Sequence, residues 1–136
     1  MPGLSDDAAR LLQEPNFATV ATLNPDGSPQ LSIVWIDWDG EDVLFNTAAG
    51  RAKPHNLERD PRVSVLVVDR EDAYRWVGVR GIAEMTTDGA DEHIDKLARK
   101  YTGEGWQPKP GEQRLLVRVR LEHVNAYGPL GDADSL

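Results

Sequence analysis

Two short turn sequences constrain the fold of this chain most, because each of them joins two strand-like segments directly. Residues 24–27 read Asn-Pro-Asp-Gly, in which proline presets its own φ angle and glycine tolerates a positive φ. Asp39 and Gly40 form a second hairpin turn. The segments they connect, 16–23, 29–38 and 42–46, are therefore expected to pair as antiparallel strands rather than as parallel β-α-β units.

The rest of the chain alternates between short helical and strand-like patterns. The expected helices cover 6–13, 54–59 and 88–101, and the further strands cover 62–68, 74–86 and 114–119, with the last continuing toward 124. The dense β-branched residues of 62–68 predict burial on both faces, and Gly78 and Gly81 predict a bulge, a bend or close packing. This order predicts a mainly β (α+β) fold, an antiparallel barrel of six to seven strands with short flanking helices.

Composition limits the classes of protein to consider. The chain has 136 residues, which fits a single domain over 1–136, with flexible termini expected at 1–4 and 131–136. A formal net charge of −8 argues against a nucleic-acid partner, and the lack of cysteine excludes disulfides and thiolate metal sites. No apolar run approaches the roughly 20 residues that cross a bilayer, and the first residues lack the cationic start of a signal peptide. A cytoplasmic protein with no membrane partner is expected.

The segment 44–53 concentrates positive charge in an otherwise acidic chain. Asn46 and Thr47 end a strand, small residues follow, and Arg51 and Lys53 come directly before a short helix with a proline in its first turn. Amide donors, a helix N-terminus and paired cations together favour binding of a phosphate or carboxylate group. The alternative, a solvated surface loop, is the ordinary environment of arginine and lysine.

Other candidate residues are open to two interpretations. Gln30 and Ser32 share one face of an alternating strand, which is either solvated or the wall of a wet pocket. The four tryptophans, at 35, 38, 76 and 106, suit a core, a subunit interface or a pocket for a flat ring. The histidines at 55, 93 and 123 have no metal-ligand spacing, so no metal site is predicted and they are interpreted as isolated surface or supporting residues. No side chain is assigned a catalytic role.

Several short motifs resemble the pyridoxamine-phosphate-oxidase-like flavoproteins, which have an FMN-binding split β-barrel. These are the runs 19–23 (Thr-Val-Ala-Thr-Leu), 26–30 (Asp-Gly-Ser-Pro-Gln) and 56–64 (Asn-Leu-Glu-Arg-Asp-Pro-Arg-Val-Ser), together with Lys53. The spacing Arg51-Ala52-Lys53 and the Asn-Leu-x-Arg-Asp-Pro-Arg run are most similar to the actinobacterial branch that uses the deazaflavin coenzyme F420. The resemblance covers roughly residues 5–127.

This resemblance implies a homodimer with two cofactor sites at the subunit interface. The positions that match cofactor-binding positions of the family are Gln30, Ser32, Ile33, Val34, Asn46, Thr47, Arg51, Lys53 and Trp76. The cofactor phosphate is expected near Thr47, Arg51 and Lys53, and the ring along residues 30–35. Ile33 and Val34 would offer backbone groups to the ring edge, and Trp76 would lie across the interface.

The function implied is that of an F420H2-dependent oxidoreductase, which transfers a hydride from reduced deazaflavin to a small organic acceptor. Two alternatives stay open: an FMN-binding flavin reductase or oxidase with the same fold, and a non-catalytic cofactor-binding protein. The acceptor is not identified by the sequence, because the segment expected to shape its pocket, residues 103–111 and the C-terminal tail, carries no recognisable chemistry.

Overall fold

The computed structural model describes residues 3–126 of the chain. Residues 3 and 4 precede the first helix and belong to no helix or strand. The predicted flexible segment 131–136 lies outside the described residues.

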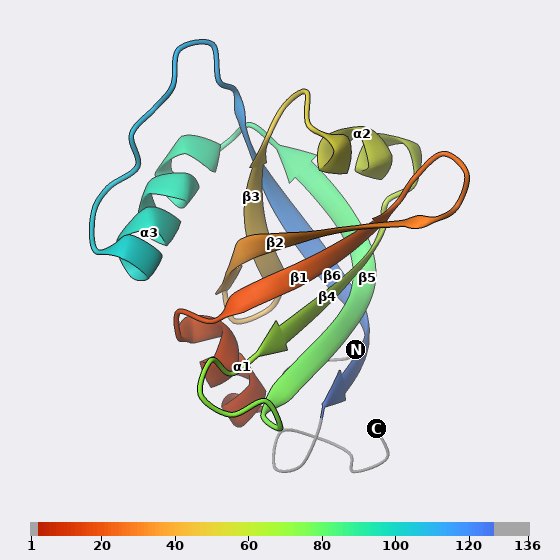
Figure 1. The fold of residues 1–136 in the computed structure, drawn as a ribbon, viewed down its shortest axis with the longest axis vertical. Helices are drawn as coiled ribbons and strands as arrows, with labels where there is room; N and C mark the ends of the chain where they lie inside the picture. Colours follow the sequence, from red (N-terminus) through yellow and green to blue (C-terminus); the bar gives the residue numbers. More distant parts are fainter. Residues whose placement is uncertain (1–2, 127–136) are drawn as a thin grey trace.

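Six antiparallel strands form a closed barrel in the order β1-β2-β3-β6-β5-β4 (Figure 1). The strands are β1 (Phe17–Leu23), β2 (Pro29–Trp38), β3 (Val43–Ala48), β4 (Arg62–Val68), β5 (Trp76–Thr86) and β6 (Arg114–Ala126). The helices are α1 (Asp6–Gln13), α2 (Ala52–Arg59) and α3 (Ala90–Thr102). The predicted mainly β, α+β fold with a six- to seven-stranded antiparallel barrel is therefore confirmed, with six strands in the described residues.

The two predicted turns do join the first three strands. Gly27 has a φ of 86° and Gly40 a φ of 97°, values that residues other than glycine rarely adopt. β1 then pairs with β2 from Phe17 opposite Trp35 to Leu23 opposite Pro29. Pairing of β3 with β6 and of β1 with β4 closes the barrel, so these closing contacts join segments far apart in sequence.

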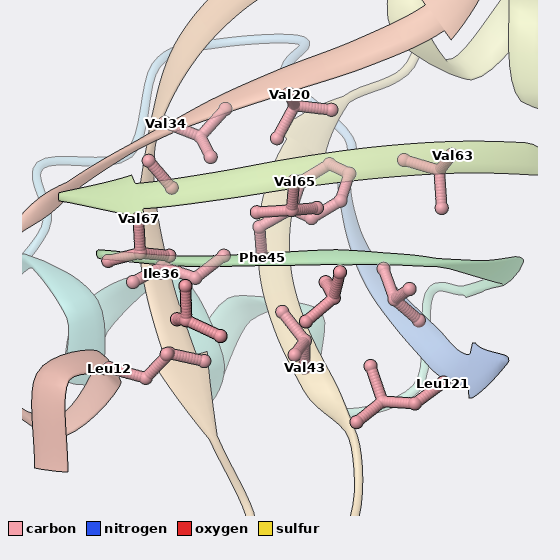
Figure 2. Packing of buried hydrophobic residues seen from close by; sticks show 14 of the residues in the cluster. Leu12, Val20, Val34, Ile36, Val43, Phe45, Val63, Val65, Val67 and Leu121 are labelled. Carbon is pink, nitrogen blue, oxygen red and sulfur yellow. The ribbon is translucent and has the colours of Figure 1, made fainter. Parts of the chain in front are cut away.

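Apolar side chains from all six strands fill the barrel. Figure 2 shows Val20, Ile36, Phe45, Val65 and other apolar groups directed into the space that the strands enclose. Helix α1 packs against β2, β4 and β5 and adds Leu11 and Leu12, which are almost fully buried. At about 25 cal/mol per Å² of buried apolar surface, this core supplies the main favourable free energy of folding.

Strand β3 is buried on both faces, whereas β4 is not. All residues of β3 are buried, because α3 packs against β2, β3 and β6 on the outside of the barrel. In β4, Val63, Val65 and Val67 point inward, but Leu66 is 41% exposed. The prediction that residues 62–68 are buried on both faces was therefore wrong for the single chain, since Arg62 and Leu66 of this strand are exposed.

Several element boundaries differ from those expected, each for a local reason. Helix α3 begins at Ala90 rather than at Asp88, because Gly89 precedes it with a left-handed φ of 74°. Helix α2 begins at Ala52, which places Lys53 inside its first turn. Strand β5 begins at Trp76, and the register between β5 and β6 shifts at Arg80 and Gly81, the bulge that the strand glycines predicted.

Candidate functional site

A pocket of about 380 Å³ lies between the outer side of β2 and β3, the start of α2, helix α3 and the loop that follows α3. It is lined by Phe17, Ile33, Val34, Trp35, Asn46, Arg51, Lys53, Ile94, Leu97, Trp106 and Arg114. Five of the residues predicted to bind cofactor are thus brought together: Ile33, Val34, Asn46, Arg51 and Lys53. Their contact with a cofactor remains a prediction.

The other four predicted residues do not line this pocket. Ser32 contacts it indirectly, because its Oγ accepts a hydrogen bond of 3.0 Å from Lys53 Nζ. Thr47 is fully buried, and its Oγ1 makes no hydrogen bond within the described part of the chain. Gln30 lies nearer the start of β2, and Trp76 lies opposite Val68 on the β4–β5 side of the barrel.

The cations at the start of α2 are arranged as an anion site would require. Arg51 is the N-terminal flanking residue of α2, and Lys53 follows in the first turn. Burial lowers the pKa of Lys53, and the nearby charge of Arg51 lowers it further. Within residues 3–126 no carboxylate forms an ion pair with either side chain. Their positive charge is therefore available to a ligand.

Arg114, at the start of β6, brings a third cation to the pocket. Its Nε donates a hydrogen bond of 2.8 Å to Asn46 Oδ1, and its guanidinium lies 4.9 Å from the ring centroid of Trp106. Burial lowers the pKa of Arg114; the charge of Glu112 opposes this shift, and that of Arg51 adds to it. Arg114 was not predicted from the sequence, because the alternating pattern of its strand places it among ordinary surface arginines.

A chain of buried polar groups leads away from Arg114. Asn46 Nδ2 donates to the carbonyl of Ala90 at 2.9 Å and lies 3.2 Å from His93 Nδ1. His93 Nε2 lies 3.2 Å from Asp37 Oδ2. Burial alone raises the pKa of Asp37, but hydrogen bonds from His93 and from the Trp38 N–H, together with the charge of Lys96, lower it to about 2. His93 is thus a buried, supporting residue, and no cluster that could hold a metal occurs among the residues described.

Aromatic and aliphatic groups form the rest of the pocket wall. The Trp35 and Tyr101 rings stack at 5.4 Å with an angle of 7° between their planes, and Trp106 meets Trp35 edge-on at 6.2 Å. Ile94 and Leu97 of α3 complete this apolar side. A flat ring and an attached acidic group would therefore both find complementary surfaces in one pocket.

The pocket adjoins an exposed apolar face on the outside of β2, β1 and β4. Leu31 and Ile33 are 62% and 63% exposed, and Phe17 and Leu66 are also exposed. Strand pairing places Ile33 opposite Thr19, and Thr19 opposite Leu66, so these residues lie on neighbouring strands. Ile33 belongs both to this face and to the pocket.

Nothing in the described part of the chain forms a helix long and apolar enough to cross a membrane.

Comparison with known proteins identifies relatives in sequence. The family model for pyridoxamine 5'-phosphate oxidase matches residues 4–128. A pyridoxine/pyridoxamine 5'-phosphate oxidase from Caulobacter vibrioides is 31% identical over 113 residues, which are 78% of this chain and 50% of that protein. The corresponding oxidase from Rubrobacter xylanophilus is 31% identical over 118 residues, which are 83% of this chain and 54% of that protein. The chain thus spans about half the length of these curated relatives.

Two solved structures share the fold over nearly their full length. An F420 reductase superimposes with a TM-score of 0.79 and 30% identity, covering 89% of this chain and 98% of that one. A conserved hypothetical protein from Mycobacterium tuberculosis superimposes with a TM-score of 0.73 and 25% identity. The match covers 95% of this chain and 93% of that one. With a family model matching nearly the whole sequence and a closed barrel of the same type, the chain belongs to the pyridoxamine 5'-phosphate oxidase family of split β-barrels.

Proposed function

We propose that this protein is an F420H2-dependent oxidoreductase that reduces a small organic acceptor. The observation that carries the proposal is the joining, in one pocket, of an aromatic wall with three cationic side chains, Arg51, Lys53 and Arg114. Deazaflavin is a flat ring with a negatively charged tail, and when bound in reduced form it supplies a hydride. The similarity to an F420 reductase along 98% of that chain supports the choice, whereas the curated oxidases are about twice as long.

The residues present fit such a cofactor. Lys53 is held at the pocket by Ser32, and its lowered pKa reflects a charge that has lost water and has no anionic partner among residues 3–126. A cofactor phosphate or carboxylate would restore the lost interactions. Trp35, Trp106 and Leu97 would exclude water from the ring. The chain's own contribution is thus binding, orientation and exclusion of solvent.

The proposal includes a homodimer in which the exposed face around Leu31, Ile33 and Leu66 is covered by a second copy of the chain. An apolar face next to the ligand pocket supports this, because covering it would remove apolar surface from water and close the pocket mouth at Ile33. The small-molecule acceptor would then enter between the two copies.

FMN is the second candidate cofactor, because the chain belongs to the pyridoxamine 5'-phosphate oxidase family, and the resemblance to FMN-binding split barrels implies this cofactor as well. FMN carries a phosphate that the same cations would bind. A flavin reductase or oxidase and a non-catalytic carrier are therefore the competing functions.

Titration of the purified protein with F420 and with FMN tests the cofactor. We expect tighter binding of F420; protein purified with bound FMN and a flavin absorption spectrum would reverse the choice.

Turnover tests the reaction. We expect F420H2 to be oxidised faster with protein than without it for at least one member of a panel of quinones, enones and tetrapyrroles. A rate equal to the protein-free control for every acceptor would favour the carrier over the enzyme.

A further inference from the structure

We propose that Arg114 is a third anion-binding residue of the pocket, and that Asp37, His93 and Asn46 position its guanidinium to receive a phosphate or carboxylate oxygen. The inference rests on the proposed function only in taking this pocket as the ligand site. It does not depend on which cofactor binds or on any redox step.

The four residues form one continuous buried chain across four elements. Asp37 (β2), Asn46 (β3), His93 (α3) and Arg114 (β6) are only 6% to 8% exposed. Burying four polar or charged side chains is unfavourable unless each is hydrogen-bonded to the next. The links are 3.2 Å from Asp37 to His93, 3.2 Å from His93 to Asn46, and 2.8 Å from Asn46 to Arg114.

The donors and acceptors in this chain allow one arrangement. Asn46 Nδ2 has two hydrogens, of which one goes to the Ala90 carbonyl and the other to His93 Nδ1. His93 Nδ1 is therefore the acceptor, and His93 Nε2 carries the hydrogen that is donated to Asp37. The amide of Asn46 cannot rotate without losing both bonds, so its oxygen stays directed at Arg114 Nε. The position of the guanidinium follows from this chain.

The guanidinium held in this way still has unused binding capacity. Arg114 Nη1 is buried and makes no hydrogen bond in the described structure; it forms an ion pair with Glu112 Oε2 at 3.4 Å, without hydrogen-bond geometry. A buried donor that lacks an acceptor is unfavourable, and an arginine fork matches the oxygens of phosphate or carboxylate.

A purely structural reading, in which Arg114 only anchors the loop, accounts for the cation–π contact with Trp106 and the ion pair with Glu112 but leaves Nη1 without a hydrogen bond in the described structure. All three cations line one pocket, and the charge of Arg51 lowers the pKa of both Lys53 and Arg114, so Arg51 lies close enough to repel each of them. An anion between them would relieve that repulsion.

Binding of inorganic pyrophosphate, measured by calorimetry at low ionic strength without cofactor, tests the role of Arg114. We expect Arg114→Met to weaken binding about tenfold or more, as for loss of a charged hydrogen bond, and Arg114→Lys to restore part of it. The matched control is Arg120→Met, which removes an equal charge from the same strand at an exposed ion pair with Glu84; it should bind as the wild type does. Thermal melts confirm that each variant is folded.

Three results would overturn the inference: no binding of pyrophosphate by the wild type, unchanged binding by Arg114→Met, or equal weakening by Arg120→Met. A further measurement is made on the folded wild-type protein, so its result does not depend on whether the Arg114→Met variant folds. The Nε–H resonance of Arg114, assigned by its loss in Arg114→Lys, should be protected from solvent exchange and should shift when pyrophosphate is added. An unshifted resonance would contradict the assignment of Arg114 to the site.

The positioning role is tested by a double-mutant cycle. We expect His93→Leu to weaken pyrophosphate binding when Arg114 is present, to abolish protection of the Arg114 Nε–H, and to have no further effect in the Arg114→Met background. Equal weakening in both backgrounds would show that His93 acts only through general stability, and would overturn this part.

The proposed redox function and the proposed role of Arg114 are tested by different outcomes. If pyrophosphate binds through Arg114 but F420H2 is not oxidised, the present inference stands and the proposed function does not. If F420H2 is oxidised but Arg114→Met binds pyrophosphate normally, the reverse holds.

Discussion

Lys53 belongs both to the cationic segment recognised in the sequence, residues 44–53, and to the wall of the pocket in the structure. It lies in the first turn of α2, whereas its contact with Ser32 comes from the tertiary fold. A lysine held in this way carries its charge into a partly dry site, where a ligand anion interacts with it more strongly than it would in water.

Replacing Lys53 with alanine should weaken cofactor binding by about 1–3 kcal/mol, because one charge-assisted hydrogen bond to the ligand is lost. Fluorescence or calorimetric titration with F420 and FMN at low salt measures the effect. Arg10→Ala on α1, which removes an equal charge from an exposed pair with Asp7, is the control. An unchanged dissociation constant for Lys53→Ala would remove this residue from the site.

Asp37 links stability to pH. Its ordinary pKa of 3.8 falls to about 2 in the folded chain. Well above pH 4 the side chain is ionised in both the folded and the unfolded chain, and its stabilising interactions are fully present. Between pH 4 and 2 only the unfolded chain takes up the proton, so the contribution to stability is lost as the pH falls.

Asp37→Asn should therefore lower the free energy of unfolding by about 2 kcal/mol at pH 7, and the difference from the wild type should shrink between pH 4 and 2. Urea unfolding at a series of pH values provides the comparison, with Asp88→Asn at an exposed position as the control. A difference that stays constant down to pH 2 would show that the ionised form of Asp37 is not specifically stabilised.

The residues of the site could be predicted from sequence only in part. Arg51 and Lys53 share one short segment, so spacing alone brought them together. Arg114 and His93 reach Asn46 through strand pairing and helix docking over separations of 68 and 47 residues, and no local pattern records such contacts.

At the scale of elements, the bulge between β5 and β6 explains why a glycine occupies position 81. A Cβ atom placed there would lie 2.1 Å from the backbone oxygen of Arg120, which cannot move aside without breaking the β5–β6 pairing. At Gly78, by contrast, a Cβ would meet the side chain of Asn125 at 3.1 Å, and that side chain can rotate.

Gly81→Ala should thus destabilise the protein by about 1–3 kcal/mol, in the range of an overpacked core, and Gly78→Ala should have a clearly smaller effect. Chemical denaturation of the two variants side by side makes the comparison. Equal effects would mean that the loss comes from glycine in a strand generally rather than from the close approach to Arg120.

The order of elements was predictable because hairpin turns and amphipathic helices are encoded locally. The exposure of β4 was not, since a run of β-branched residues looks the same whether a helix covers its outer face or leaves it open. Here α3 packs on the outside of β3, whereas Leu66 of β4 is left exposed in the described part of the chain. The sequence records the apolar content of a strand, and the tertiary structure decides which face is covered.

At the scale of the whole molecule, the face formed by Leu31, Ile33, Phe17 and Leu66 is the surface for the proposed second copy. Burying this face between two copies would make the free energy of dimerisation more favourable, in proportion to the apolar area removed from water. A single charge placed at its centre would have to be buried without a partner, which is strongly unfavourable.

Leu31→Glu should convert the proposed dimer into a monomer at micromolar concentration and weaken cofactor binding at the same time. Sedimentation velocity gives the mass, and titration with cofactor gives the affinity. Gln13→Glu, an equal change of charge at an exposed position of α1, should leave both unchanged. A wild-type chain that sediments as a monomer would contradict the dimer outright.

The pairing of β3 with β6 also has a kinetic consequence. Asn46 and Arg114 meet only after the polypeptide between them has closed into a large loop, and such long-range pairing is slow to form. A chain that refolds from denaturant would therefore acquire its hairpins and helices first and its ability to capture an anion last. The rate at which ligand binding recovers after dilution from denaturant would therefore report the rate at which β6 pairs with β3 and closes the barrel.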